Sequence, residues 1–164
     1  MRVRVGGVRA DRPRFDLPRL AFTACLAAFG CAATSPSAGT PGVVNDRLAP
    51  CPASPNCVSS QADDSAHRVA PLRYDGEVAA ALERLVAVLR DMPRTRIVGR
   101  DATTVRAECT TLLFRFVDDV DLVVDDAAHV IHVRSASRVG YSDLGVNRRR
   151  VERIRSAFAQ PRPP

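Results

Sequence analysis

Apolar side chains recur at a helical spacing near the middle of the chain. They lie four, three, four and three positions apart, at Val78, Leu82, Leu85, Leu89 and Met92. This spacing places them on one face of a helix. Asp75 is a suitable N-cap before the stretch, and Pro93 ends it because proline cannot continue the backbone hydrogen-bond ladder. The pattern predicts a helix between these two residues.

The following residues alternate between apolar and polar side chains, as strands with one buried face do. Four strands are predicted, at Thr95–Arg100, Thr103–Cys109, Leu112–Val124 and His129–Ser137. In the third strand every even position is apolar except Asp118. This carboxylate therefore interrupts a face that is otherwise predicted to be buried.

The third and fourth strands are predicted to form a hairpin around a four-residue loop, Asp125–Ala128. In this register Val124 faces His129 and Asp118 faces Ser135. The outward face then pairs Asp121 with His132, Asp119 with Arg134 and Arg115 with Arg138. A bulge at Asp118–Asp119 is an alternative that would turn the second carboxylate inward.

A second helix is predicted to begin near Asp143, a suitable N-cap. Its apolar face contains Leu144, Val151, Ile154 and Phe158. Residues 51–160 are therefore predicted to form a single α+β domain, in which a four-stranded antiparallel sheet packs against an N-terminal and a C-terminal helix.

The chain starts with the layout of a secretory signal peptide, since an arginine-rich segment precedes the apolar residues 20–30. Residues 1–30 are predicted to be that signal peptide. Gly30 and Cys31, followed by Ala-Thr-Ser-Pro-Ser, resemble a bacterial lipoprotein signal and predict lipidation of Cys31. A soluble secreted or periplasmic protein and an uncleaved anchor are the alternatives. Residues 31–50, rich in Ala, Ser, Thr, Pro and Gly, are predicted to be a disordered, flexible tether.

The net charge of +6 does not indicate nucleic-acid binding. Six of the 24 arginines and two of the 18 acidic residues lie in the first nineteen positions, so four of the six net charges belong to the predicted leader. The remainder is nearly neutral and only 5% of the chain is aromatic. Arg148, Arg149 and Arg150 are expected to form a solvated helix face, with anionic lipid headgroups as the alternative contact.

Cys51 and Cys57 are predicted to form a disulfide in an oxidising compartment. A metal site that recruits His67 is the weaker alternative, since the spacing is not typical of zinc, and no metal or cofactor is predicted. Cys109 lies in a predicted strand and is expected to be a small buried residue.

A polar cluster is predicted at the open end of the hairpin. Its members are Asp118, Asp119, Arg134, Ser135, Ser137, Arg138, Tyr141, Asp143, Asn147, Arg148 and Arg150. In the architectural interpretation Asp118 caps turn amides or pairs with Arg138 or Arg148, because a buried charge needs a partner. In the ligand-binding interpretation the guanidinium groups and serines hold a phosphate or carboxylate. An enzymatic alternative uses Asp118 or Asp119 as a general base or metal ligand.

Three segments resemble the domain of unknown function 1499 family. They are Cys-Pro-Ala-Ser-Pro-Asn-Cys-Val-Ser-Ser at 51–60, Phe-Val-Asp-Asp-Val at 116–120, and Val-Arg-Ser-Ala-Ser-Arg-Val-Gly-Tyr-Ser-Asp-Leu-Gly-Val-Asn-Arg-Arg-Arg at 133–150. The resemblance implies a small envelope-associated, lipoprotein-like domain of bacteria and plastids without an established activity or catalytic residue. Cys109 stands where the family is expected to have serine.

These observations predict a membrane-anchored, non-enzymatic binding or structural domain of the bacterial cell envelope. Its expected partners are the membrane, through a lipid anchor, and an anionic small molecule, a lipid headgroup or an envelope protein. The alternative is an envelope hydrolase that uses Asp118 or Asp119.

Overall fold

The computed structural model describes residues 42–44 and 47–160 of the 164-residue chain. The predicted signal peptide, the lipidation site at Cys31 and most of the predicted tether lie outside these residues. The described residues all belong to one compact unit.

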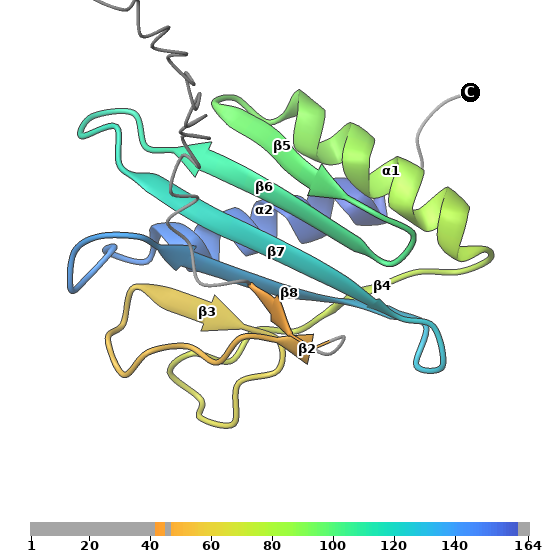
Figure 1. Ribbon diagram of the computed structural model, residues 1–164, viewed down its shortest axis with the longest axis horizontal. Helices are drawn as coiled ribbons and strands as arrows, with labels where there is room; N and C mark the ends of the chain where they lie inside the picture. Colours follow the sequence, from red (N-terminus) through yellow and green to blue (C-terminus); the bar gives the residue numbers. More distant parts are fainter. Residues whose placement is uncertain (1–41, 45–46, 161–164) are drawn as a thin grey trace, which may run out of the picture. The chain divides into compact units, whose positions relative to one another are not determined.

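This unit contains two helices and a six-stranded antiparallel sheet, as shown in Figure 1. In chain order the elements are β1 (Val43–Val44), β2 (Arg47–Leu48), β3 (Cys57–Ser59), β4 (Leu72–Arg73), α1 (Val78–Asp91), β5 (Thr95–Arg100), β6 (Thr104–Thr110), β7 (Val117–Asp125), β8 (Val130–Ser137) and α2 (Val146–Ala159). The sheet order is β3-β8-β7-β6-β5, with β4 also paired to β8, and β1 and β2 pair separately. The predicted α+β class is confirmed. The four predicted strands correspond to β5, β6, β7 and β8, whereas β3 and β4 add two strands that were not predicted.

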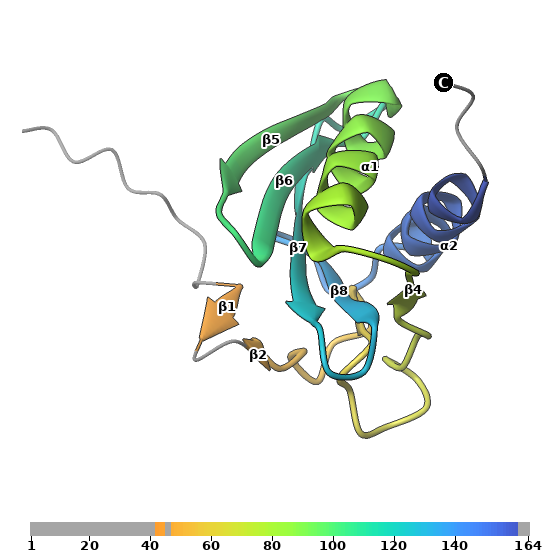
Figure 2. The ribbon, with the colours of Figure 1, turned by 90° about the vertical axis from the view of Figure 1, so that its right-hand side faces the viewer.

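Both helices cover the same face of the sheet, and β1 and β2 lie on the opposite side (Figure 2). The core between sheet and helices is built from large, fully buried side chains. They include Phe158 and Ile154 of α2, Leu85 and Leu89 of α1, and Leu122 and Ile131 of the sheet. The helical spacing seen in the sequence thus corresponds to the buried stripe of each helix.

The start of α1 was predicted incorrectly. The N-cap position is Glu77 rather than Asp75, and no side chain caps it. Gly76 adopts a φ of +80° between the two residues, and this left-handed turn separates Asp75 from the helix. The helix ends as predicted, immediately before Met92 and Pro93.

The third predicted strand begins five residues too early. β7 starts at Val117, and residues 111–116 form a loop that is closed by hydrogen bonds from the Thr111 amide to the Phe116 carbonyl (2.8 Å) and from the Phe116 amide to Thr111 Oγ1 (2.9 Å). Arg115 adopts a φ of +53° in this loop, which ends the extended conformation. The alternation of apolar residues continues through the loop, so the pattern alone did not mark the boundary.

The predicted hairpin register is wrong by two residues. Asp125 pairs with Val130, so the loop is Asp126–His129, and Asp118 faces Ser137 instead of Ser135. The Asp125 carboxylate accepts the Ala128 amide (3.1 Å), and His129 makes the final turn with a φ of +50°. Because side chains alternate with a period of two, Asp118 still points inward. The pairing is continuous, so the alternative bulge at Asp118–Asp119 does not form.

The residues after the predicted tether and part of the tether itself are packed on the sheet. Leu48 and Ala49 are buried, and the Leu48 amide donates to Gln61 Oε1 at 2.9 Å. Described structure therefore includes residues 42–44 and 47–50 of the predicted tether, ahead of the predicted boundary at residue 51.

His67 joins the segment between β3 and β4 to the loop that the Cys51–Cys57 disulfide closes. The predicted disulfide between Cys51 and Cys57 is confirmed. His67 contacts Asp64 Oδ1 through Nδ1 (2.8 Å) and the Ser54 carbonyl through Nε2 (3.1 Å). These bonds make His67 a link between the disulfide loop and the segment that follows it.

The stability of the domain is expected to decrease as pH rises through the pKa of His67. Hydrogen bonds from its ring to Asp64 and to the Ser54 carbonyl raise this pKa above the usual 6.5, and only the protonated ring donates from both nitrogens. The stabilisation is therefore complete below the pKa of the unfolded chain and is lost as pH passes the higher folded-state pKa. Urea unfolding between about pH 5 and 9 measures this loss.

The matched control for this prediction is His132, which lies on β8. His67→Gln should remove the decrease in unfolding free energy over that interval, whereas His132→Gln should retain it. Equal pH profiles for wild type and His67→Gln would contradict the assignment.

Candidate functional site

The structure divides the predicted polar cluster between the two faces of the sheet. On the face that the helices cover, Asp118, Ser135 and Ser137 of the sheet meet Asn147 and Arg150 of α2. The members on the outer face are Asp119, Arg134 and Arg138. Tyr141 is exposed in the β8–α2 loop, and Arg148 contacts the segment between β3 and β4. The cluster is therefore not a single site.

The inner group is centred on the guanidinium of Arg150. It pairs with Asp118 Oδ2 and donates to Ser135 Oγ (3.0 Å) and Asn147 Oδ1 (2.5 Å). Asp118 is 1% exposed and Arg150 is 7% exposed. A buried carboxylate requires such a partner. The predicted pairing of Asp118 with Arg138 or Arg148 is wrong because the helix presents Asn147 and Arg150, one turn apart, to the sheet.

Asn147 connects the inner group to two other parts of the chain. Its Nδ2 donates to the Asn56 carbonyl (2.9 Å) and to Ser137 Oγ (3.0 Å), and its Oδ1 accepts Ser135 Oγ (2.6 Å). Asn56 in turn donates to the Gly140 carbonyl at 2.5 Å. The group therefore joins the β3 segment, β8 and α2.

The prediction that Asp143 is the N-cap of α2 is wrong, although its carboxylate does bind backbone amides at the start of this helix. The N-cap position is Gly145, whose φ of +77° favours glycine. The Asp143 carboxylate accepts the amides of Gly145 (2.8 Å) and Asn147 (2.7 Å). Both oxygens are thereby used for the helix start, where a negative charge is favourable.

The outer group is a network of ion pairs. Arg138 binds Asp119 (2.8 and 3.0 Å) and Glu108 (2.6 Å), and these bonds raise the pKa of Arg138 and lower that of Glu108. Arg134 lies 3.5 Å from Asp121, not beside Asp119 as predicted. These guanidinium groups are occupied by carboxylates, so the outer face does not form the anion site expected from the sequence.

Asp121 is the buried member of the outer network. Its carboxylate contacts Arg106 at 3.2 Å as well as Arg134, yet burial is the main influence and raises its pKa.

Cys109, on the inner face of β6, is also buried, and burial raises the pKa of its thiol. The expectation of a small, buried, unreactive Cys109 agrees with this environment.

Asp118 borders a cavity of about 350 Å³ with mainly apolar walls. Its lining comes from the loop 111–116 and from residues 137–146. Asp118 Oδ1 is buried and has no hydrogen-bond partner among the described residues. Such an atom is costly to bury unless a donor reaches it. This cavity, bordered by a carboxylate with one unpaired oxygen, is the candidate site.

The two loops that line the cavity carry exposed apolar side chains, defined here as the apolar patch. Its members are Leu112, Leu113, Phe114, Phe116, Val139, Tyr141 and Leu144, which are 46–84% exposed. The prediction that Leu112, Phe114 and Phe116 belong to a buried strand face is therefore wrong. Of the large apolar side chains exposed in the described part of the chain, only Val98 lies outside the patch.

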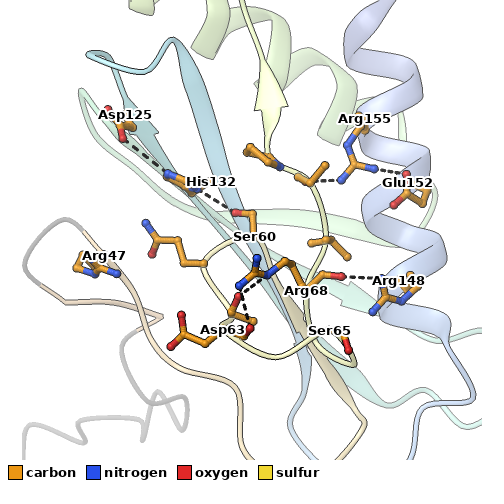
Figure 3. Close-up of a pocket in the computed structure, with 15 residues that line it drawn as sticks. Arg47, Ser60, Asp63, Ser65, Arg68, Asp125, His132, Arg148, Glu152 and Arg155 are labelled. Atoms are coloured by element: carbon orange, nitrogen blue, oxygen red, sulfur yellow. Dashed lines mark hydrogen bonds and ion pairs between the residues drawn. The ribbon is translucent and has the colours of Figure 1, made fainter.

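A second, polar cavity of about 920 Å³ lies between the β3–β4 segment and α2, as shown in Figure 3. Its arginines mainly hold the backbone. Arg68 donates to the carbonyls of Ala62 and Asp63, Arg148 to those of Ala66 and Arg68, and Arg155 to that of Ala70. These contacts could not be predicted from the sequence, because every residue has a backbone carbonyl and no residue type marks the ones that accept.

The same cavity contains Ser60, His132 and Asp125, a combination familiar from hydrolases (Figure 3). Ser60 Oγ lies 3.1 Å from His132 Nδ1 and accepts the Val133 amide at 2.9 Å. The Asp125 carboxylate is 3.8 Å from His132 Nε2, beyond hydrogen-bond distance. Ser60 thus fastens β8 to the segment after β3 through His132 and the Val133 amide, and the three residues lack the orienting bond of a catalytic triad.

Residues 47–158 match the family model described as protein of unknown function (DUF1499). The chain belongs to the DUF1499 family. The match covers all described residues of this DUF1499 protein except 42–44 and 159–160, so the resemblance seen in the sequence is confirmed. No curated protein matched the chain at a significant level.

Within the part of the DUF1499 chain that the structure describes, neither helix is long and apolar enough to cross a bilayer. No group of three or more His, Cys, Asp or Glu side chains within residues 42–44 and 47–160 is arranged to hold a metal ion.

Replacing Arg150 is expected to destabilise this DUF1499 domain by about 3–5 kcal/mol, because Arg150→Met leaves the buried Asp118 carboxylate unpaired. Urea unfolding gives the change in free energy. The exposed Arg153 of the same helix is the control, and Arg153→Met should change stability by less than about 0.5 kcal/mol.

The double variant Asp118→Leu/Arg150→Met separates a charge effect from lost packing. Removing both charges should restore most of the stability lost in Arg150→Met. A double variant as unstable as the single one would contradict the assigned role of the ion pair.

Proposed function

We propose that this DUF1499 domain is a non-enzymatic binding module of the cell envelope that holds an amphiphilic small molecule in the cavity beside Asp118. The observation that carries the proposal is that the carboxylate bordering this cavity with apolar walls, Asp118, has a buried oxygen, Oδ1, without a hydrogen-bond partner among the described residues. Ligand sites typically combine apolar walls with a few fixed polar groups and have volumes of about 300–1,000 Å³.

The polar groups around the cavity favour a ligand that donates a hydrogen bond. Asp118 Oδ1 can only accept one, and Asp143 is a second carboxylate in the lining. An anionic group would face both acids, whereas a hydroxyl or ammonium group satisfies Asp118. The proposed ligand therefore has a donor head and an apolar body, in contrast to the anionic ligand expected from the sequence.

The envelope location rests on the sequence and on the disulfide. The signal peptide at residues 1–30, lipidation at Cys31 and attachment to a bacterial membrane remain predictions. The disulfide between Cys51 and Cys57 supports export, because such bonds persist in oxidising compartments.

A hydrolase has less support than a binding module. Asp119 is engaged by Arg138 on the opposite face of the sheet. Both oxygens of the second carboxylate in the cavity lining, Asp143, accept hydrogen bonds from backbone amides. A general base needs a positioned nucleophile or water beside a reacting group, and the neighbours of Asp118 in the cavity are largely apolar.

The proposed ligand chemistry predicts that decylamine and decanol bind the full chain more tightly than methyl decanoate, which lacks a donor. A hydrogen bond to a charged group contributes about 1.5–3 kcal/mol, so the difference in Kd should be about tenfold to a hundredfold. Isothermal titration with each probe gives the Kd.

Asp118→Asn should reverse this preference. The amide oxygen of the new side chain can accept from Arg150 while its NH2 group faces the cavity as a donor, which suits the ester carbonyl. Asp119→Asn, on the opposite face, is the matched control and should keep the wild-type order. Equal binding of all three probes, or an unchanged order in Asp118→Asn, would refute the proposed site.

A further inference from the structure

We propose that the apolar patch docks this domain on an anionic membrane surface, with its side chains in the interfacial region of the bilayer. The patch comes from two loops, β6–β7 and β8–α2, that lie at the same end of the sheet (Figure 1). Contiguous exposed apolar surface of this kind marks an interaction site.

The loops present the patch in a defined conformation. The β6–β7 loop is closed by the two hydrogen bonds between Thr111 and Phe116, and the rings of Phe114 and Phe116 stack with their centres 5.5 Å apart. The Asn56 side chain binds the Gly140 carbonyl in the other loop. Exposed apolar groups that are held in place in this way lose little conformational entropy when they enter another phase.

Exposed arginines lie next to the patch and complement anionic headgroups. Arg115 is between Phe114 and Phe116 in sequence. Arg94 Nε donates to the Thr110 carbonyl (3.2 Å), and Arg149 Nη1 donates to the Leu144 carbonyl (3.0 Å). Asp143 is turned to the start of α2 by its two amide bonds. Apolar and aromatic side chains with neighbouring arginines are typical of surfaces that lie on anionic bilayers.

The observations favour a bilayer over a second copy of the chain. A symmetric dimer through this patch would bring like arginines of the two copies together. The predicted lipid at Cys31 would also keep the domain close to a membrane. Docking would open the Asp118 cavity towards the lipid phase, so that an amphiphile could enter it from the bilayer. This entry of a ligand rests on the proposed function, whereas docking itself does not.

The absence of tryptophan from the sequence allows a single reporter to be introduced at a chosen position. The test uses the full chain with Cys31→Ser, which removes the predicted lipid, and with either Phe114→Trp in the patch or Val98→Trp outside it. Both positions are exposed. Vesicles are made of phosphatidylcholine with or without phosphatidylglycerol, and a third set contains brominated phosphatidylcholine as a quencher.

With phosphatidylglycerol vesicles, the F114W fluorescence should shift to shorter wavelength and be quenched by the brominated lipid, while the V98W fluorescence should not change. Leu113→Asp should weaken vesicle binding at least tenfold. Arg115→Glu should weaken it and make it less dependent on salt, whereas Arg153→Glu, on α2, should not change it. Melting temperatures of these surface variants are expected to match the wild type.

Three outcomes would overturn docking: no response at position 114, equal responses at positions 114 and 98, or an F114W shift that follows protein concentration instead of lipid. The last result would identify the patch as a contact between copies. Decanol titration without vesicles tests the Asp118 ligand site separately, so failure of docking and failure of the proposed function give different results.

Discussion

The buried ion pair between Arg150 and Asp118 is the interaction on which the rest of this structure depends. It joins α2 to the centre of the sheet, and through Asn147 the same group reaches the β3 segment and β8. Burying a carboxylate without a partner costs several kcal/mol. The packing of the last helix, the position of the Cys51–Cys57 loop and the end of β8 are therefore coupled through one charged group. This group leaves one oxygen of Asp118 without a hydrogen-bond partner among the described residues, and Asp118 is also the residue that borders the cavity.

The sequence predicted the elements whose patterns are local. The apolar spacing of α1, the bounds of β5 and the inward orientation of Asp118 follow from periods of 3.6 and 2, which one stretch of chain displays by itself. The inward orientation survived an error in register because the error was two residues. The partner of Asp118 could not be derived in the same way, since the choice between Arg138, Arg148 and Arg150 depends on where α2 begins relative to β7.

The apolar patch was missed for a different physical reason. Burial is the usual fate of Leu and Phe at alternating positions, and the alternation from Leu112 to Val124 gave no sign of the loop before Val117. Arg115 adopts a left-handed backbone conformation, and an arginine in a sequence does not predict this conformation. The core was predicted on the rule that alternating apolar residues are buried, and this rule does not hold for a surface on which such residues are exposed. The candidate site lies where that rule failed.

The long sequence separations within the polar group have a consequence for biogenesis. Asn147 lies 91 residues from Asn56, and Arg150 lies 32 residues from Asp118. A growing chain that has not yet produced α2 has no Arg150 to offer the carboxylate of β7, so its sheet cannot bury Asp118 at low cost. Completion of the native core must wait for nearly the whole polypeptide. The native packing of this domain requires its last helix, which suits a chain that is predicted to cross a membrane before it folds.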